Sequence, residues 1–265
     1  MYSPLQLTFK YLSYRLTAAN GKGHGIHSPF VFDFVQHVLN KKEKPFAWTQ
    51  AEQLRNQLLK NREVIEVEDF GAGSYHQRTR RRKIADIAYN TAKPKKYARV
   101  LYRIVEHYAC RNIIELGTCL GISTVYMALA NTAARIITCE GSGALSEISR
   151  ENFRKLHLDN ITVLTGEFNQ TLLKALHEMP SVDLAFIDGN HRQEPTVRYF
   201  ENILPYVHND SILVFDDIHW SSDMEAAWEQ IKQHPSVSET IDLFFLGIVF
   251  FRAEQKVKQH FSIRY

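Results

Sequence analysis

Two apolar segments of strand length lead into side chains that can bind a metal ion or move a proton. Residues 182–187 are followed by Asp-Gly-Asn-His, and residues 211–216 end in an aspartate followed by Asp-Ile-His. Carboxylates gathered at one edge of a sheet repel one another unless a cation binds between them, and oxygen ligands suit magnesium. We therefore expect a divalent ion such as Mg²⁺ to be held by the oxygen donors of this edge, which are Asp188, Asn190, Asp216 and Asp217.

Three side chains of this edge are candidates for a general base that removes a proton from a hydroxyl group, namely Asp188, His191 and His219. A bound metal ion would instead lower the pKa of the hydroxyl directly. Each histidine has the alternative of a hydrogen-bonded structural role. Asp217 has the alternative of capping the next helix, for which Ser221, Ser222 and Asp223 compete.

A glycine-containing turn after an earlier strand predicts a nucleoside site. The strand over residues 112–116 runs into a turn that contains Gly117 and Gly121, whose missing side chains permit a tight turn close to a ligand. Glu140 ends the next strand, 19 residues after Gly121, where a carboxylate accepts hydrogen bonds from ribose hydroxyls. The spacing is G-x-x-x-G, not the G-x-G-x-x-G of dinucleotide sites, and Glu115 would repel a pyrophosphate. A nucleoside with an amino-acid-like tail fits this turn better than NAD.

The segment Glu-Leu-Gly-Thr-Cys-Leu-Gly-Ile-Ser-Thr, residues 115–124, resembles the first motif of class I S-adenosylmethionine-dependent methyltransferases, especially their small-molecule O-methyltransferase branch. The likeness covers roughly residues 100–252. It implies that Glu115 and Gly117 line the methionine part of S-adenosylmethionine, that Glu140 binds its ribose, and that Gly166–Phe168 contacts its adenine. The cofactor-binding residues that we predict are Glu115, Gly117, Thr118, Gly121, Ser123, Thr124, Glu140, Gly141, Glu167, Phe168 and Asp188.

The acidic edge is similar to that of metal-dependent sugar and catechol-type O-methyltransferases. In those enzymes an acid after the fourth strand and an acidic pair after the fifth hold magnesium against the acceptor hydroxyls. This chain has Asn190 where the sugar branch often has aspartate, which lowers the negative charge of the site. For Asp188 an alternative is hydrogen bonding to the cofactor alone.

Regular alternation of strands and helices from residue 112 onward predicts the elements that position these residues. Strands are expected at 112–116, 135–139, 161–165, 182–187, 211–216, 238–245 and 247–252, with helices near 122–131, 144–157, 169–178, 193–206 and 223–233. The last two strands are joined by a turn around Leu246-Gly247 and should form an antiparallel hairpin. The predicted fold is α/β, a Rossmann-like class I methyltransferase sheet of seven strands, mainly parallel, with a terminal antiparallel hairpin.

Residues 1–105 are predicted to form a mainly helical appendage that selects the acceptor, and residues 106–265 the cofactor-binding domain. Helices are expected over 29–39 and 50–60, a strand or extended segment over 64–70, and one or two helices over 79–108, broken near Lys93-Pro94. Val67–Ser74 also looks like a first methyltransferase motif, but no strand–helix series follows it, so we expect a loop.

The predicted appendage is basic. It holds 19 Lys and Arg against 8 Asp and Glu, whereas residues 106–265 hold 13 against 21. The densest group, Arg78, Arg80, Arg81, Arg82 and Lys83, suits the phosphates of RNA, a nucleotide-linked substrate or a membrane surface, with a solvated helical face as the alternative. Gly21–Phe32 is either a lid that carries His24 or His27 to the acceptor or a loop that docks Phe30 and Phe32 on the core.

Composition limits the class of protein and the compartment in which it works. The hydrophobic fraction is 45% and the charged fraction 23%, which excludes wholesale disorder, and three cysteines without metal-ligand spacing fit a reducing compartment. We expect a cytoplasmic enzyme without a secretory signal or membrane span, monomeric or a homodimer. The predicted function is S-adenosylmethionine-dependent O-methylation of a small anionic or sugar-like acceptor. The alternatives are an RNA methyltransferase and a non-catalytic binding module.

Overall fold

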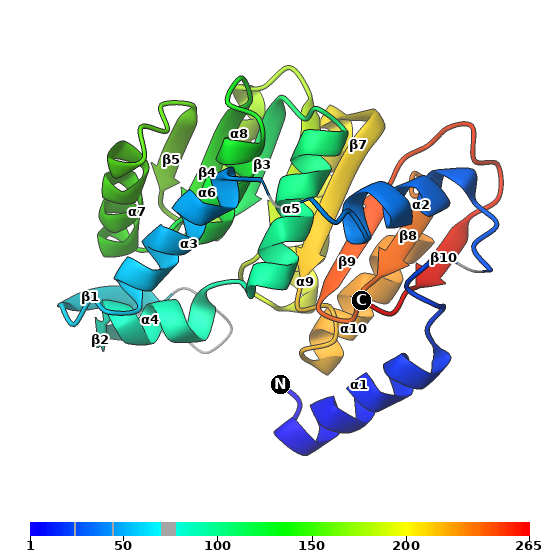
Figure 1. Ribbon diagram of the computed structural model, residues 1–265, viewed down its shortest axis with the longest axis horizontal. Helices are drawn as coiled ribbons and strands as arrows, with labels where there is room; N and C mark the ends of the chain where they lie inside the picture. Colours follow the sequence, from blue (N-terminus) through cyan, green and yellow to red (C-terminus); the bar gives the residue numbers. More distant parts are fainter. Residues whose placement is uncertain (24, 44, 70–77) are drawn as a thin grey trace. The chain divides into compact units, whose positions relative to one another are not determined.

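The computed structural model describes residues 1–23, 25–43, 45–69 and 78–265 (Figure 1). The chain divides into two compact units. The continuous unit is Lys42–Met179, and the discontinuous unit combines Met1–Lys41 with Pro180–Tyr265. The division at residue 105, which rests on charge and expected function, stays a prediction.

The continuous unit carries the first three strands of the predicted alternation. β3 (Asn112–Leu116), β4 (Arg135–Glu140) and β5 (Ile161–Thr165) pair in parallel in that order. They alternate with α6 (Ile122–Ala130), α7 (Gly143–Lys155) and α8 (Phe168–His177). β3 and β4 bury all but their first residues, as strands of a parallel sheet covered on both faces do. These bounds confirm the predicted ones to within two residues.

The remainder of the continuous unit corrects one expectation. It contains α3 (Ala47–Leu58), β1 (Val64–Asp69), β2 (Arg78–Lys83), α4 (Ile84–Thr91) and α5 (Lys95–His107). The helix expected from residue 79 is wrong over 79–83, because this basic segment is a strand antiparallel to β1 that places Arg81 opposite Glu66. Opposite charges facing each other across a ladder stabilise the pair. The break at Pro94 and the extended segment from residue 64 are confirmed.

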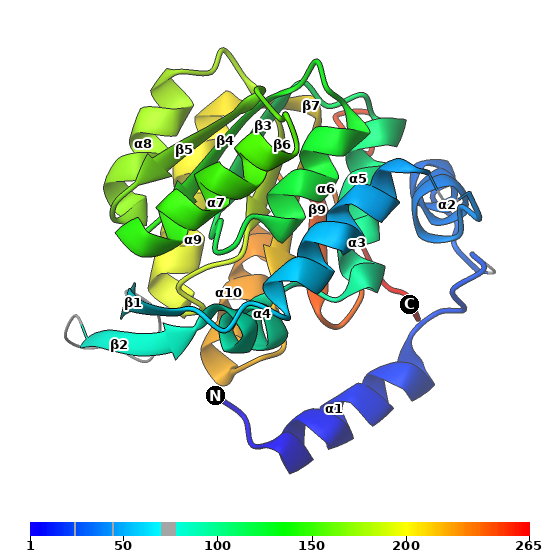
Figure 2. The same cartoon turned by 60° about the vertical axis from the view of Figure 1, so that its left-hand side comes forward.

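The discontinuous unit holds the other strands. β6 (Val182–Ile187) and β7 (Val207–Asp216) are parallel, and β9 (Leu246–Phe250) is antiparallel to both β7 and β8 (Glu239–Asp242). Between them lie α9 (Gln193–Ile203), the short helix η2 (Leu204–Tyr206) and α10 (Ser222–Gln233). A strand that the sequence did not predict, β10 (Gln259–Ser262), adds to β8 in parallel (Figure 1). Figure 2 shows β6, β7 and β9 of the same unit from a second side. The mainly parallel strands and the terminal antiparallel hairpin are confirmed.

The turn of the terminal hairpin lies earlier than predicted. It occupies residues 243–245, where Phe244 has φ 70°, and Gly247 is inside β9. A Cβ atom at Gly247 would lie 2.7 Å from the Trp228 ring, so the glycine permits close packing of α10 on the strand and does not make the turn.

The N-terminal segment of the discontinuous unit contains α1 (Pro4–Thr17), α2 (Pro29–Phe34) and the π-helical turn η1 (Val35–Leu39). The helix expected over 29–39 is confirmed. Of the two phenylalanines expected to dock, Phe30 packs edge-on against Phe250 at 4.9 Å between ring centroids, whereas Phe32 is 45% exposed. His24, Phe70–Ser74 of the second motif-like segment and the side chain of Arg78 lie outside the described residues. Among the helices of the described ranges, none has the length and hydropathy needed to cross a membrane.

Candidate active site

The turn between β3 and α6 is built from backbone hydrogen bonds that glycine makes possible. Gly117 has φ 100° and Gly121, the residue that caps α6, has φ 82°. The amides of Gly117 and Thr118 both donate to the Cys139 carbonyl on β4, and the Gly121 amide donates to the Thr118 carbonyl at 2.8 Å. The turn is therefore held close to the end of β4, as the predicted nucleoside site requires.

Glu140 ties three turns of the continuous unit together. One carboxylate oxygen accepts the Cys119 amide at 2.7 Å and the other accepts the Ser142 amide at 2.9 Å. The Glu140 carbonyl accepts the amide of Gly166, at the turn before α8. Glu140 is 8% exposed. Nearby on α7 and its cap, the hydroxyl oxygens of Ser142 and Ser146 are buried and have no hydrogen-bond partner among the described residues.

Glu115 has a structural surrounding that the sequence did not predict. Its side chain is fully buried, and its carboxylate accepts hydrogen bonds from Ser123 and Thr124 of α6 at 2.5 Å and from Thr138 of β4 at 2.7 Å. Thr118 in turn bonds Thr138 at 2.6 Å. Glu115, Ser123 and Thr124 therefore fasten α6 and β4 to β3 behind the turn. Their contact with the cofactor stays a prediction.

The other predicted cofactor residues of the continuous unit lie at the ends of β4 and β5. Gly141 is buried directly after Glu140. Glu167 is exposed, and its carbonyl accepts the amides of Gln170 and Thr171 in the first turn of α8. Phe168 is half-buried at the first position of that helix.

In the discontinuous unit, the structure gathers Asp188, His191 and Asp216 into one group. Their ligating atoms all lie within 4.8 Å of one another, and His191 Nε2 is 3.6 Å from Asp188 Oδ1. Asp216 is 1% exposed at the end of β7, while Asp188 and His191 are half-buried in the loop after β6. We call this group the Asp–His–Asp cluster. It overlaps the predicted metal ligands in Asp188 and Asp216 and brings in His191, which we had predicted as a base.

Asn190 and Asp217 stand outside the Asp–His–Asp cluster. Asn190 adopts φ 67° and donates its side-chain amide to the Tyr199 hydroxyl at 3.1 Å, while its Oδ1 is buried with no partner among the described residues. Asp217 has φ 53°, and its backbone amide donates to the Phe245 carbonyl. Ser221, not Asp217, caps α10 by accepting the Met224 amide.

His219 lies between two carboxylates. Its Nδ1 is 3.0 Å from Glu225 and its Nε2 is 2.8 Å from Asp242, and the ring stacks on Phe244. Burial lowers the pKa of His219, but the hydrogen bonds and charges of Asp242 and Glu225 outweigh burial and raise the pKa above its usual value. With both nitrogens engaged, His219 is placed to hold α10 to β8, and this geometry gives no support to its predicted role as a base.

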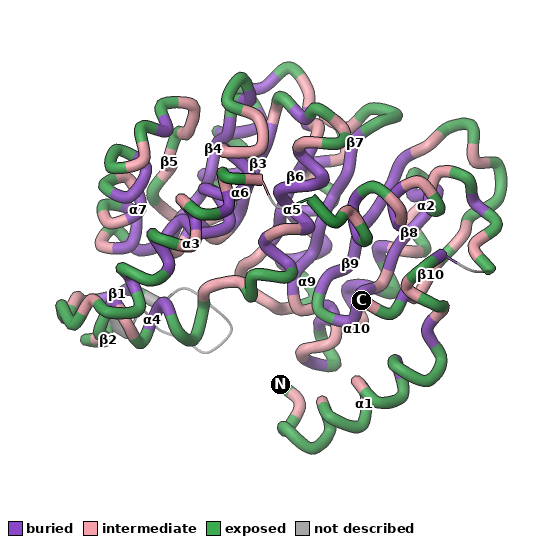
Figure 3. The backbone as a smooth tube through the Cα atoms, viewed as in Figure 1, coloured by how far each residue is buried: buried purple, intermediate pink, exposed green. Residues whose placement is uncertain are grey.

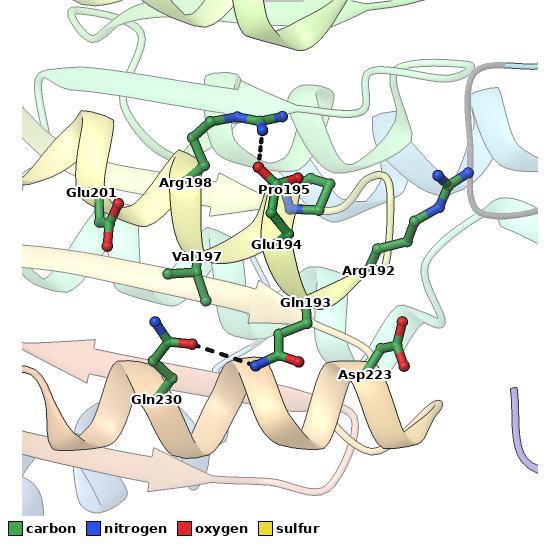
Figure 4. A pocket seen from close by; sticks show the side chains of 9 residues that line it. All are labelled: Arg192, Gln193, Glu194, Pro195, Val197, Arg198, Glu201, Asp223 and Gln230. Carbon is green, nitrogen blue, oxygen red and sulfur yellow. Dashed lines mark hydrogen bonds and ion pairs between the residues drawn. The ribbon is translucent and has the colours of Figure 1, made fainter.

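An open cleft of about 600 Å³ lies between α9 and α10 (Figure 4). The two helices run side by side, with Arg192 and Asp223 near their N-terminal ends, and Gln193 reaches across to Gln230 at 3.4 Å. Arg192 directly follows His191 of the Asp–His–Asp cluster. The lining is polar and of mixed charge, and consists of Arg192, Gln193, Glu194, Pro195, Val197, Arg198, Glu201, Asp223 and Gln230.

Residues 114–218 match the model of a known family, described as a methyltransferase domain. The chain carries a class I methyltransferase domain. The match begins inside β3 and ends just after β7, so it includes both the glycine turn and the Asp–His–Asp cluster. It confirms the resemblance that the residues around Gly117 indicated.

Individual relatives of the methyltransferase domain agree with this assignment. A catechol O-methyltransferase of Mycobacterium tuberculosis is 27% identical over 115 residues, which are 41% of this chain and 48% of the relative. The chain thus matches about half the length of that curated relative.

Solved structures resemble more of the chain. The O-methyltransferase of Bacillus cereus in complex with S-adenosylhomocysteine (SAH) has a TM-score of 0.56 at 20% identity, over 83% of this chain and 97% of its own. TomG of Streptomyces achromogenes, involved in tomaymycin synthesis and solved with S-adenosylmethionine (SAM), has a TM-score of 0.55 at 14% identity, over 80% and 92% of the two chains. At such identities the likeness shows the fold, which is the Rossmann-like methyltransferase fold predicted above.

Proposed function

We propose that this chain transfers the methyl group of SAM to a hydroxyl oxygen of a small acceptor. The observation that carries the proposal is the arrangement around Glu140, whose carboxylate binds the amide of the glycine turn and lies at the end of β4. Ligands of open α/β sheets bind outside the carboxyl ends of the strands, where this arrangement is built.

The residues of the turn fit SAM. The backbone of Gly117 and Gly121 leaves room for close approach, and Glu140 carries the charge suited to ribose hydroxyls. The buried hydroxyls of Ser142 and Ser146, which have no described partner, supply polar atoms that a nucleoside would satisfy. When bound, SAM supplies an electrophilic methyl group for in-line transfer to the acceptor oxygen.

The Asp–His–Asp cluster is the candidate for handling the acceptor proton. His191, whose Nε2 lies 3.6 Å from Asp188 Oδ1, would accept the proton of the acceptor hydroxyl. A divalent cation also fits: two carboxylates and an imidazole at this separation suit a first-row ion such as Mn²⁺, and suit Mg²⁺ less than an all-oxygen set would. Asp188, His191 and Asp216 would hold that ion, with Asn190 and Asp217 beside them.

The cleft between α9 and α10 supports a polar acceptor. Its amide, guanidinium and carboxylate groups can hydrogen-bond to hydroxyl groups, and Arg198 is paired with Glu194. With two arginines against three acids in its lining, the cleft favours a sugar-like acceptor over a strongly anionic one.

Some of the basic residues of the predicted appendage interact with other side chains of the continuous unit. Arg99 and Arg103 lie over the Trp48 ring at 4.5 and 5.2 Å, and Lys95 pairs with Glu52 at 2.7 Å. Since this charge has partners within the fold, the RNA methyltransferase alternative gains no support from it.

A binding experiment tests the proposal. Titration with SAH followed by calorimetry should give saturable binding, and SAH at 100 times its dissociation constant should stabilise the fold by about 2.7 kcal/mol. Glu140→Gln should weaken binding at least tenfold, whereas Glu178→Gln, at an exposed ion pair of the same unit, should not. Transfer of labelled methyl groups from SAM to a panel of catechols and glycosides, with RNA as a parallel acceptor, then assigns the substrate. A folded wild type that binds neither SAM nor SAH would overturn the proposal.

A further inference from the structure

The loop that follows β6 has a backbone conformation that side chains rarely adopt. Asn190 and His191 have φ angles of 67° and 42°, so two consecutive residues other than glycine lie in the left-handed region. Strain of this kind persists only where neighbouring groups hold it, and it is concentrated at functional sites. Figure 3 shows β6, the strand that leads into the loop, as buried along most of its length. A contact that holds the loop therefore also determines where His191 of the Asp–His–Asp cluster lies.

Tyr199 of α9 makes such a contact with the loop. The Asn190 side-chain amide donates to the Tyr199 hydroxyl at 3.1 Å, and Tyr199 is 2% exposed. Because a buried ring is closely packed on all sides, the hydroxyl is a fixed acceptor for the Asn190 amide. Burial raises the pKa of Tyr199, so the hydroxyl stays neutral throughout the pH range of an ordinary assay.

We propose that Tyr199 is a positioning residue for methyl transfer, which holds Asn190 in the left-handed conformation and thereby sets the place of His191. The inference rests on the proposed function, in which His191 accepts the proton of the acceptor hydroxyl. Asn190 directly precedes His191, so a change in the φ angle of Asn190 rotates the next peptide. That rotation would carry the His191 ring away from Asp188 and Asp216, whose ligating atoms lie within 4.8 Å of it.

Packing alone does not explain the hydroxyl of Tyr199. A phenylalanine ring would fill the same space, and burying a hydroxyl group costs free energy unless the group is hydrogen-bonded. Glycine at position 190 would adopt the observed φ angle without strain, but it would leave the loop free to take other conformations. Asn190 and Tyr199 together provide the left-handed conformation and the hydrogen bond that holds it.

Helix α9 connects the loop to the cleft that we assign to the acceptor. Val197 and Arg198 of this helix line the cleft, and Tyr199 is the next residue along the chain. The Thr196 hydroxyl donates to the Met224 sulfur of α10 at 3.6 Å, so α9 is also anchored to the opposite wall of the cleft. The hydrogen bond from Asn190 to Tyr199 therefore fixes the loop that carries His191 to the same helix that lines the cleft.

Hydrogen exchange of the full chain, followed by mass spectrometry, tests the positioning without any ligand. Tyr199→Phe removes only the hydroxyl. We expect the amides of residues 188–192 to exchange about tenfold faster than in the wild type, while the amides of β7 keep their wild-type rates. Tyr206→Phe, at a half-buried tyrosine of η2, is the matched control and should leave both segments unchanged. Unchanged exchange in 188–192, or an equal acceleration in β7, would overturn the positioning role.

Steady-state kinetics tests the consequence for methyl transfer. With a verified acceptor, Tyr199→Phe should lower kcat about tenfold and leave the KM for SAM within twofold of the wild type. In the Asn190→Gly background no side chain can bond the hydroxyl, so Tyr199→Phe should there change kcat less than twofold.

Two kinetic results would refute the positioning role, namely a wild-type kcat in Tyr199→Phe or equal losses in the Asn190 and Asn190→Gly backgrounds. A wild type that binds neither SAM nor SAH, with exchange rates as expected, would instead overturn the proposed function and leave Tyr199 as the residue that holds the loop.

Discussion

Gly121 gives a quantitative test of how the cofactor turn is built. It caps α6 with φ 82°, and a Cβ atom there would lie 2.5 and 2.7 Å from two atoms of the Phe153 ring. Both the backbone conformation and the ring therefore exclude a side chain. Gly121→Ala is the smallest substitution that tests both the backbone conformation at this position and its contact with the Phe153 ring.

Two costs add for Gly121→Ala. An L-residue in the left-handed region costs roughly 1–2 kcal/mol. Overpacking a side chain against a buried ring costs roughly 1–3 kcal/mol more, because the neighbours must shift. We expect the free energy of unfolding to fall by about 2–5 kcal/mol, which is on the order of 5–15 °C in melting temperature for a chain of this size.

Urea unfolding monitored by circular dichroism measures this loss. Gly143→Ala is the matched control, since a Cβ atom at Gly143 meets nothing within 4 Å and the residue lies at the start of α7. That variant should match or slightly exceed the stability of the wild type. The double variant Gly121→Ala/Phe153→Leu separates the two costs, because it relieves the ring contact and leaves the backbone strain.

We expect a favourable coupling energy of about 1–2 kcal/mol between Gly121→Ala and Phe153→Leu. Additive losses would show that the ring does not oppose the new methyl group. A Gly121→Ala variant as stable as the wild type would refute the described geometry of the turn altogether. SAH affinity, measured on the same proteins, should fall in Gly121→Ala and be unchanged in Gly143→Ala.

Three further predictions follow from single side chains. The pKa of His219 is raised in the folded state, so the stability from its two carboxylate partners is fully present below the unfolded pKa near 6.5 and is lost as pH rises through the folded pKa. The advantage of the wild type over His219→Gln in urea unfolding should therefore shrink from pH 6 to pH 9, and a constant difference would contradict this. Burial raises the pKa of Cys139 to about 12, so Ellman's reagent at pH 8 should label the partly exposed Cys119 and leave Cys139 unreacted until the protein unfolds; equal labelling of both in the native protein would count against the structure. Asp188→Asn should lower methyl transfer to a verified acceptor by on the order of 100-fold and reduce stabilisation by Mn²⁺, and a normal rate would remove Asp188 from the proposed catalytic group.

The regular part of the fold was predictable because its signals are local. Each strand from β3 to β6 is an apolar run of the right length, and so are residues 211–216 of β7, which begins four residues earlier than predicted and includes the polar segment His208–Ser211. Gly117 and Gly121 mark the turn where the chain must bend sharply. The family match over residues 114–218 lies within this regular stretch. Periodicity and glycine spacing needed no tertiary information there.

The failures occurred where distant partners decide the structure. Arg78–Lys83 is rich in good helix formers, and only its pairing with the acidic strand β1 makes it a strand. Gly247 looked like a turn residue, although it is glycine because Trp228 packs against it. β10 is four residues long and pairs in parallel with β8, and its last residue also accepts the Ala19 amide.

The sequence indicated which strands and turns carry the site. It did not indicate in which direction the side chains of those turns point. Strand ends indicated which residues share an edge, but the positive φ angles of Asn190, His191 and Asp217 decide which side chains converge. No local pattern announces those angles. The burial of Glu115 among three hydroxyls likewise depends on Thr138, which belongs to another strand.

The discontinuous unit imposes an order on synthesis. The ribosome completes Lys42–Met179 first, and this stretch contains all of the contacts of its own unit. Residues 1–41 emerge earliest, yet Tyr14 and Ala19 bind residues 262–265, which are made more than 240 residues later. At 5–20 residues per second, α1 waits on the order of ten seconds or more with its apolar residues exposed. The helix is fixed in place only after Glu225, Phe244 and Ile263, which anchor it, have been made.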